Sequence, residues 1–373
     1  MKFRTYVLFF LLFGVLTDVV MGLTLLKDAQ LGWKLLMAAP TLAAGCCLPL
    51  IAAGIVYTDA LRIFSFLMFI FALPKTLTVW LGQLLPVPVA VGIGIAVSVF
   101  FLIFIFYVSR HLKVQPVRLS FPDLPAGFDG LRVCHITDLH LGSLGRKSGY
   151  VRRMVSTIMA QQPDLILFTG DLVSFEAREA DAYKPWLQSL TAPMGVFAIF
   201  GNHDFLLHGP HDVEGRKQDM QKLEAFEKEL GWQVLRNRSQ LLERGGDRIA
   251  LAGVDNVSSN PYFQKTGGDL TQALEGIPDK LFTILLSHDA THWRMEVLPN
   301  TGIQLTLSGH THGLGYKLTG LHPSHWKLPE SAGVYREGNQ VLHVSPGLGS
   351  AFAFRLGGYP EIDMITLTKT NLL

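Results

Sequence analysis

Apolar residues are unevenly distributed along the chain, and their pattern changes near residue 109. The first part contains long apolar runs that reach the roughly 20 residues a helix needs to cross a membrane. These runs predict four transmembrane helices, at residues 6–26, 35–57, 63–81 and 87–108. The third run contains Pro74 and Lys75, so three spans remain the alternative.

Beyond residue 109, short apolar runs alternate with amphipathic segments, which is typical of a layered α/β domain. Strands are predicted at 131–136, 165–169, 196–200, 249–254, 281–286, 305–308, 340–344 and 361–367. Helices are predicted at 149–160, 179–190, 218–230 and 290–297. We therefore expect a multi-span anchor at 1–112, a proline-bearing linker at 113–130 and an α/β domain at 131–373.

The charge distribution supports this division into two parts. Only 17% of the 373 residues are charged, against about a quarter in an ordinary globular protein. The first 109 residues hold nine charged side chains, whereas the other 264 hold 26 basic and 27 acidic ones and all 13 histidines. This composition excludes a disordered or collagen-like chain, and the net charge of +2 gives no sign of a nucleic-acid-binding module. Three cysteines cannot form a disulfide framework.

The basic residues that flank the apolar runs predict the orientation in the membrane. With four spans, both ends of the anchor face the side that holds most of these residues, so we expect the second part to be cytoplasmic. With three spans it would lie on the opposite side. We expect the first run to be retained rather than cleaved as a signal peptide, because further spans follow it.

Two charged residues, Asp18 and Lys75, lie deep within the apolar runs. Each is twelve residues from the start of its run, which places both about 18 Å from the same face of the membrane. Because intramembrane charges are usually paired, we hypothesise an ion pair. The alternative is that Lys75 snorkels to the interface and Asp18 faces a polar pocket. The runs show no internal repeat, so an anchor is a simpler role than a transporter.

Potential metal ligands follow five of the predicted strands directly. The clusters are Asp138-Leu139-His140, Gly170-Asp171, Gly201-Asn202-His203-Asp204, Ser287-His288-Asp289 and Gly309-His310-Thr311-His312. Ligands in open α/β sheets bind beyond the carboxyl ends of the strands, so these clusters should converge. Imidazole, carboxylate and amide groups suit divalent first-row metals, and the number of ligands indicates two ions that share a bridging carboxylate.

These clusters resemble the motifs of the calcineurin-like metallophosphoesterase superfamily, with each block present and in the family's order across 131–367. The segment 347–362 is also similar to membrane-associated bacterial members. The resemblance implies a four-layer sandwich in which two β-sheets are flanked by helices. It implies one metal site formed by Asp138, His140, Asp171 and His312, and a second formed by Asp171, Asn202, His288 and His310. It further implies that His203 donates a proton or a hydrogen bond to the substrate and that Asp204 orients His203.

The expected function is therefore that of a membrane-anchored hydrolase with two metal ions (Mn, Fe, Zn or Co). It would cleave a phosphodiester or pyrophosphate bond by attack of a metal-bridging hydroxide. A lipid or nucleotide-linked lipid is the candidate substrate, because UDP-diacylglucosamine pyrophosphohydrolases are among the family's analogues. The alternatives are a non-catalytic metal-binding scaffold and a sensor on the same fold.

Several residues outside the motifs receive separate expectations. We expect His135 to be packed inside its strand or to support a ligand, whereas His208 and His211 could lie at the mouth of the site or in a loop. Arg355, with Phe352, Phe354 and Tyr359 around it, could hold a phosphate headgroup or belong to a packed tail.

Overall fold

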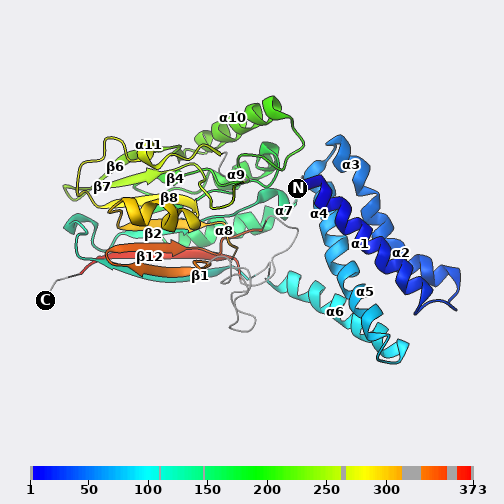
Figure 1. Cartoon of the computed structure of the whole chain (residues 1–373). Coiled ribbons are helices and arrows are strands. Elements are labelled where there is room, and N and C mark those ends of the chain that lie inside the picture. The colour runs from blue at the N-terminus through cyan, green and yellow to red at the C-terminus, as the bar shows by residue number, and fades with distance from the viewer. Residues whose placement is uncertain are drawn as a thin grey trace. The chain divides into compact units, whose positions relative to one another are not determined.

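The computed structural model describes residues 3–108, 111–145, 148–261, 266–312, 329–350 and 359–370. The chain divides into two compact units, one built mainly from residues up to 109 and the other from residues 110 onward. Each unit has its own arrangement of helices and strands (Figure 1).

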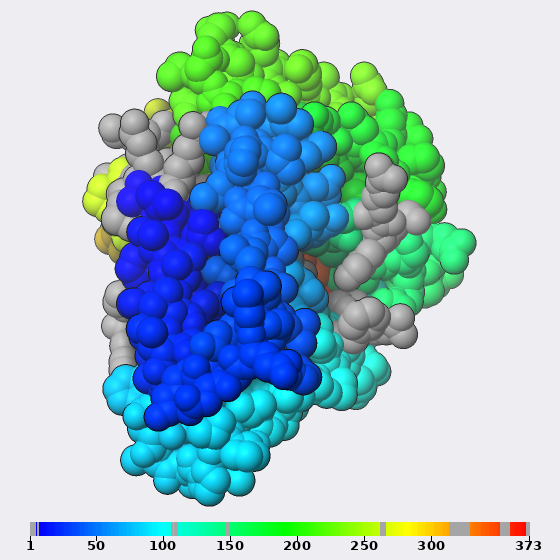
Figure 2. Space-filling model, turned by 90° about the vertical axis from the view of Figure 1, so that its right-hand side faces the viewer, coloured from blue at the N-terminus to red at the C-terminus, as the bar shows by residue number. Residues whose placement is uncertain are grey.

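The first unit consists of apolar helices. They are α1 (Phe3–Leu23), α2 (Leu31–Gly45), α3 (Cys47–Ala53), α4 (Tyr57–Leu67), the π-helix η1 (Met68–Ala72), α5 (Leu73–Leu81) and α6 (Val87–Val108). Three segments are long and apolar enough to cross a membrane, namely Leu31–Ala53, Tyr57–Leu81 and Val87–Ile105, and Val7–Leu23 is a shorter apolar helix. Figure 2 shows α1, in dark blue, lying against the lighter blue helices that follow it.

The apolar run that contains Pro74 is helical throughout. Pro74 lies at the amino-terminal end of α5, directly after the π-helical turn of η1. Proline is tolerated in the first turn of a helix because the amide hydrogens of that turn have no acceptor within the helix, so the missing one breaks no hydrogen bond. Neither Pro74 nor the buried Lys75 therefore interrupts the segment Tyr57–Leu81.

The hypothesised ion pair between Asp18 and Lys75 is confirmed. The Lys75 ammonium donates a short hydrogen bond to Asp18 Oδ1. It also donates to Met37 O at 3.2 Å and to Thr41 Oγ1 at 2.9 Å. Lys75 is 8% exposed, and its three hydrogen bonds connect α1, α2 and α5. The charge is thus neutralised inside the helical unit, as burial in an apolar environment requires.

We expect Lys75→Met to destabilise the helical unit, because the largely enclosed Asp18 carboxylate, whose side chain is 13% exposed, then loses its partner. Breaking a buried pair costs about 3–5 kcal/mol. Thermal unfolding in detergent should show a clear loss for Lys75→Met and none for Lys34→Met, since Lys34 is half-buried and its ammonium makes a solvent-exposed hydrogen bond to Lys27 O. The double variant Asp18→Lys with Lys75→Asp should recover part of the stability lost by either single change. No recovery would argue against a stabilising pair.

The second unit contains two mixed six-stranded sheets. The first has the order β1-β12-β2-β3-β4-β5 and the second the order β10-β11-β9-β8-β7-β6. The strands of the first are β1 (Lys113–Phe121), β2 (Arg132–Ile136), β3 (Leu165–Phe168), β4 (Val196–Ala198), β5 (Gln233–Val234) and β12 (Glu361–Lys369). Those of the second are β6 (Arg238–Arg244), β7 (Asp247–Gly253), β8 (Thr283–Asp289), β9 (Leu305–Gly309), β10 (Gly333–Glu337) and β11 (Gln340–Val344).

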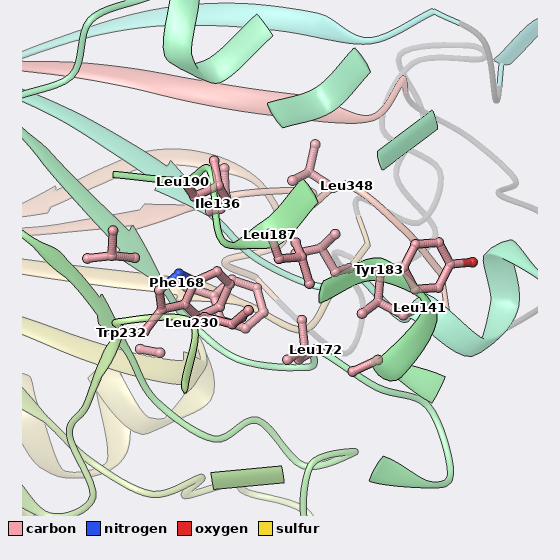
Figure 3. Packing of buried hydrophobic residues seen from close by; sticks show 14 of the residues in the cluster. Ile136, Leu141, Phe168, Leu172, Tyr183, Leu187, Leu190, Leu230, Trp232 and Leu348 are labelled. Atoms are coloured by element: carbon pink, nitrogen blue, oxygen red, sulfur yellow. The ribbon is translucent and has the colours of Figure 1, made fainter. Parts of the chain in front are cut away.

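Three apolar clusters hold the layers of this unit together. One lies between the two sheets and combines Val133 and Leu167 with Leu251 and Leu307. A second covers the outer face of the first sheet, where α8 (Ser148–Ala160), α9 (Lys184–Leu187) and α10 (Val213–Glu229) pack (Figure 3). The third covers the outer face of the second sheet and is centred on the fully buried Trp293. The predicted helix–sheet–sheet–helix architecture is confirmed.

Shorter elements complete the second unit. They are the helices α7 (Leu141–Leu144), α11 (Leu270–Ala273) and α12 (Leu298–Asn300), the 3-10 turns η2 (Ala126–Phe128), η3 (Ala177–Glu179) and η4 (Asp181–Tyr183), and the π-helix η6 (Trp293–Val297).

The structure contains three strands that the sequence pattern does not predict, β5, β6 and β10. It also differs from the sequence-based expectation in the linker and in one helix. The predicted linker 113–130 contains β1, which pairs in parallel with β12 along its whole length. An edge strand accommodates Pro116 because one side of it carries no ladder partner. The helix predicted at 179–190 is divided into η3, η4 and α9, with Pro185 in the first turn of α9.

Candidate metal centre

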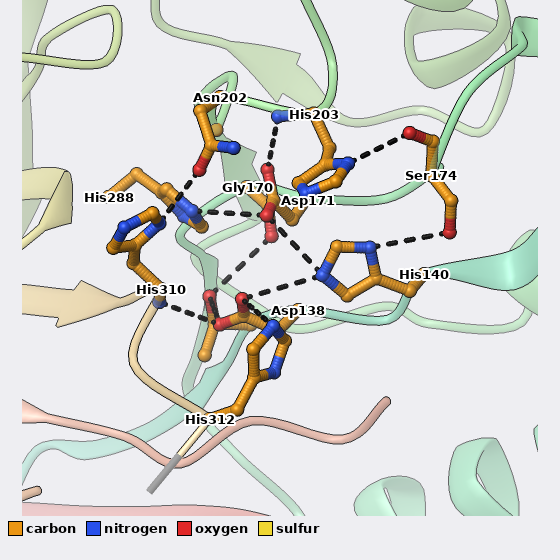
Figure 4. Close-up of polar contacts among 12 residues, drawn as sticks. Asp138, His140, Gly170, Asp171, Ser174, Asn202, His203, His288, His310 and His312 are labelled. Carbon is orange, nitrogen blue, oxygen red and sulfur yellow. Dashed lines mark hydrogen bonds and ion pairs between the residues drawn. The ribbon is translucent and has the colours of Figure 1, made fainter. Parts of the chain in front are cut away.

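The loops that follow β2, β3, β4, β8 and β9 converge on one group of polar side chains (Figure 4). The structure brings all seven predicted ligands together there: Asp138, His140, Asp171, Asn202, His288, His310 and His312. Six of the seven lie in loops at the ends of strands, and His288 is the second-last residue of β8. Neighbouring strand ends thus position the whole set, as expected for an α/β sheet.

The backbone is unusually constrained at this group. Asp138, His140, Asp171, His310 and His312 all adopt positive φ angles, between 45° and 70°. Side-chain-bearing residues rarely occupy this region, and such strain is concentrated at functional sites. These left-handed turns aim consecutive polar side chains toward the same point rather than to opposite sides of the chain.

Asp171 lies at the centre of the group. Its Oδ2 atom is 3.3 Å from His140 Nε2 and 3.2 Å from His288 Nε2, and its Oδ1 accepts the His203 amide hydrogen at 2.8 Å. Two imidazoles from different loops therefore approach the same carboxylate oxygen. This is the arrangement expected of a carboxylate that bridges two cations.

Potential ligands lie on both sides of Asp171. On one side, Asp138 Oδ1 is 3.7 Å from both His140 Nε2 and His312 Nε2. On the other side, His310 Nδ1 is 2.7 Å from Asn202 Oδ1. The potential ligand atoms of Asp138, His140 and His312 lie within 4.8 Å of one another, as do those of Asp171, His288 and His310.

Further contacts orient the ligand imidazoles. His288 Nδ1 donates to Thr169 O at 2.7 Å, which directs Nε2 toward Asp171. His310 Nε2 lies 3.6 Å from Asp289 Oδ2. Hydrogen bonding of the second ring nitrogen fixes the orientation and tautomer of metal-binding histidines.

The residues present fit a pair of divalent cations. Asp138 Oδ1, His140 Nε2 and His288 Nε2 are buried without a hydrogen-bond partner among the described residues. Leaving such atoms unsatisfied is costly, and all three point into the group around Asp171. Imidazole nitrogens and carboxylate oxygens are the donors that first-row divalent ions prefer.

Mutual attraction sets the charge state of the group. Burial opposes ionisation of Asp138 and Asp171, but the surrounding imidazoles hold the pKa of both carboxyls well below the usual range. Burial also disfavours the charged form of His288, yet the Asp171 carboxylate raises its pKa to about 10. Cations at this position would displace that proton, because metal-bound histidine is neutral.

His203 and Asp204 have contacts that differ from the expected ones. His203 Nδ1 donates to Ser174 O at 2.8 Å. The Asp204 carboxylate instead accepts backbone amide hydrogens from Asp171, Leu172, Val173 and Gly201, at 2.6 to 3.3 Å. Ser174 O therefore takes the orienting position that the sequence analysis gave to Asp204. Nothing in the motif signals this, because a carbonyl group is common to every residue.

The remaining candidate histidines have distinct surroundings. His135 is buried, with Nε2 2.9 Å from Thr169 Oγ1, as expected of a packed residue that supports a ligand. The His208 ring lies 5.5 Å from that of His203 and thus beside the group. His211 Nε2 lies 3.6 Å from Asp219 Oδ2. Arg355 and the phenylalanines beside it lie outside the described residues.

The group lies within a segment that matches known proteins. Residues 131–314 match the family model for calcineurin-like phosphoesterase. The chain is 32% identical to the metallophosphoesterase YkuE of Bacillus subtilis over 263 residues, covering 66% of this chain and 82% of that protein. It is 29% identical to a zebrafish (Danio rerio) transmembrane protein with metallophosphoesterase domain, covering 69% of this chain and 57% of that protein. It is 25% identical to the UDP-2,3-diacylglucosamine pyrophosphatase LpxG of Chlamydia trachomatis, with coverages of 68% and 88%.

We expect Gly309→Ala to weaken metal binding. A methyl group at Gly309 would collide with Thr137 Oγ1 and Asp138 Oδ2 and displace the Asp138 carboxylate. Displacing a ligand or its supporting group typically costs 10–100-fold in metal affinity. The measurement is the dissociation constant of Mn²⁺. The matched control is Gly302→Ala, where an added methyl group meets nothing within 4 Å. Equal affinities for the two variants would contradict the prediction.

Proposed function

Because the chain belongs to the calcineurin-like phosphoesterase family, whose members are metal-dependent hydrolases, we propose that it cleaves a phosphodiester or pyrophosphate bond at a membrane surface. The observation that carries this proposal is the position of Asp171 Oδ2, close to one imidazole from each of two ligand groups. Such an arrangement suits two cations that share a carboxylate, which is typical of phosphate-ester hydrolysis.

The proposed ligand sets follow the two sides of Asp171. One cation would be held by Asp138, His140, Asp171 and His312, and the other by Asp171, Asn202, His288 and His310. When bound, the pair would supply a nucleophile derived from water near neutral pH and positive charge for the phosphate oxygens. Mn, Fe, Zn and Co all suit this donor set.

His203 is the proposed proton donor to the leaving oxygen. Burial lowers its pKa to about 3, so the ring is neutral near pH 7 in the ligand-free chain. Because Nδ1 donates to Ser174 O, the lone pair of the neutral ring is on Nε2. A phosphate anion bound beside it favours the protonated imidazole, the form that can protonate a leaving oxygen. His203 would thus gain its proton together with the substrate.

The proposed role of Asp204 is to position the metal ligands. Its carboxylate joins the amides of the loop that carries Asp171 to the amide of Gly201. Burial and the nearby Asp171 carboxylate raise the pKa of Asp204 to about 7, although its backbone hydrogen bonds oppose this shift. Asp204 therefore fixes the distance between Asp171 and the segment that carries Asn202 and His203.

The apolar helices support a substrate at the membrane. We propose four spans, with the hydrolase unit on the cytoplasmic side, on the basis of the flanking basic residues. A membrane anchor raises the effective concentration of lipid headgroups around the site. One relative is a pyrophosphatase named for a UDP-linked diacyl sugar. A lipid or nucleotide-linked lipid is accordingly the proposed substrate class.

We expect Asp171→Asn and His203→Ala both to reduce hydrolysis of an aryl phosphodiester, His203→Ala by about 10² to 10⁴-fold, the usual contribution of an acid–base group. Only Asp171→Asn should also reduce the metal content, because His203 is placed outside both ligand sets. His211→Ala is the control, since its contacts are with Glu176 and Asp219, and it should retain activity. Full turnover by metal-loaded Asp171→Asn would exclude the bridging role, and no turnover by the wild-type protein would favour the scaffold alternative.

We expect the full-length protein in mixed micelles with Mn²⁺ to prefer an acylated substrate. The comparison pairs a UDP-linked diacyl sugar with its deacylated form, which has the same pyrophosphate bond. The preference in kcat/KM should reach about 10²-fold, because protein and acylated substrate are concentrated in the same micelle. Equal rates would exclude the lipid preference while leaving the phosphohydrolase proposal intact.

A further inference from the structure

A polar cluster interrupts the apolar layer between the two sheets. The inward faces of β2, β11 and β12 carry the apolar residues Val133, Val341 and Ile365. On each strand, the residue two positions nearer the metal centre is polar. These polar residues are His135, His343 and Asp363, which are 0%, 2% and 1% exposed, respectively. Period-two alternation places all three on the face that elsewhere forms the core.

The three side chains lie in mutual contact across the sheets. His135 Nδ1 is 3.2 Å from His343 Nδ1, and His343 Nε2 is 3.8 Å from Asp363 Oδ1. One potential ligand atom from each residue lies within 4.8 Å of the other two. The group therefore joins β2 and β12 of the first sheet to β11 of the second.

Two observations suggest that the cluster accepts a ligand. Asp363 Oδ2 is buried without a hydrogen-bond partner among the described residues, which is costly in an apolar layer. A cavity of about 240 Å³ reaches His343 and Asp363 from the side of β1 and β10, and Glu361 also lines it. The cavity thus provides an acidic entry path to the cluster.

We propose that His135, His343 and Asp363 form a third cation site, which binds one divalent first-row ion such as Zn²⁺. The two Nδ1 atoms form a hydrogen bond at 3.2 Å. A zinc ion could replace it with little movement, because two nitrogens bound to zinc at about 2.0–2.1 Å in tetrahedral geometry lie about 3.3 Å apart. Two imidazoles and one carboxylate are a common zinc donor set, and three protein ligands leave a fourth position for water.

The charge states of the cluster agree with such a site. Burial raises the pKa of Asp363 to about 7 and lowers that of His343 to about 4. Near neutral pH, the imidazoles are therefore neutral and ready to coordinate, and a cation would displace the carboxyl proton. A hydrogen bond from Ser345 and the charge of Lys113, which forms its ion pair with Glu361, lower the pKa of Asp363 but do not offset burial.

The third site would connect the two sheets and support the metal centre. His135 Nε2 lies 2.9 Å from Thr169 Oγ1, and the carbonyl oxygen of Thr169 accepts the hydrogen bond that orients His288. A cation at the cluster would fix His135 and, through Thr169, the position of His288. This inference does not depend on the proposed reaction, since a structural ion would act in the same way in a non-catalytic protein.

The test is zinc stoichiometry of the full-length protein in detergent, measured by mass spectrometry after chelation, reloading with Zn²⁺ and removal of the excess. Asp363→Asn should bind one ion per chain fewer than the wild type. Glu361→Gln, a change on the same strand and the same face, should bind as many as the wild type. Asp171→Asn should lose ions from the metal centre and still lose one more when combined with Asp363→Asn. Equal stoichiometry in Asp363→Asn and the wild type would overturn the proposal.

A gain of signal provides a test that does not depend on loss of binding. His343→Cys places a thiolate in the proposed ligand set, so reloading with Co²⁺ should produce a sulfur-to-cobalt charge-transfer absorption absent from the wild-type protein. The signal should persist when Asp171→Asn is added, which separates this site from the metal centre. A folded His343→Cys protein, shown by an unchanged circular dichroism spectrum, that lacks this absorption would exclude the site.

Discussion

The Asp204 carboxylate is the contact on which the metal centre depends most. It accepts amide hydrogens from three consecutive residues after β3 and from Gly201 after β4. Asp171 is held at a positive φ of 60° within the first of these segments, a conformation that persists only where its surroundings determine it. Two further contacts join the same two loops: the His203 amide donates to Asp171 Oδ1, and His203 Nδ1 donates to Ser174 O. Asp204, with four backbone amides, makes the most extensive of these contacts.

The sequence predicts the ligands better than it predicts their support. Strand-like runs followed by Asp, Asn and His predict the seven side chains that the structure brings together, because strand ends and residue types are both local properties. The partner of His203 is Ser174 O, and a backbone carbonyl leaves no mark in a motif. The role of Asp204 is similarly hidden, because its contacts with backbone amides depend on how two loops meet. Tertiary geometry, rather than residue identity, decides both.

The same limit applies to the fold. The alternation of strands and helices predicts a layered α/β domain, and the family resemblance implies its two sheets, but the prolines of 113–130 predict a linker where the structure has β1. β1 is stabilised by pairing with β12, some 250 residues away in the chain, and such long-range pairing is not visible in local propensity. In the helical unit, by contrast, the depth of a side chain in the membrane follows from the number of residues between it and the start of its helix. The pairing of Asp18 with Lys75 could therefore be predicted from sequence.

Buried polar groups in this protein occupy two environments that demand different compensation. In the helical unit, Lys75 neutralises Asp18 and donates to Met37 O and Thr41 Oγ1, so the side chains themselves complete the network. In the α/β unit, Asp138 Oδ1, His140 Nε2, His288 Nε2 and Asp363 Oδ2 have no hydrogen-bond partner among the described residues. An unsatisfied buried polar atom costs about 1–3 kcal/mol, and the convergence of three of these four on Asp171 supports partners there that are not amino acids. Cations satisfy carboxylate and imidazole donors together, so the same physical argument that supports the metal centre also applies to the cluster between the sheets.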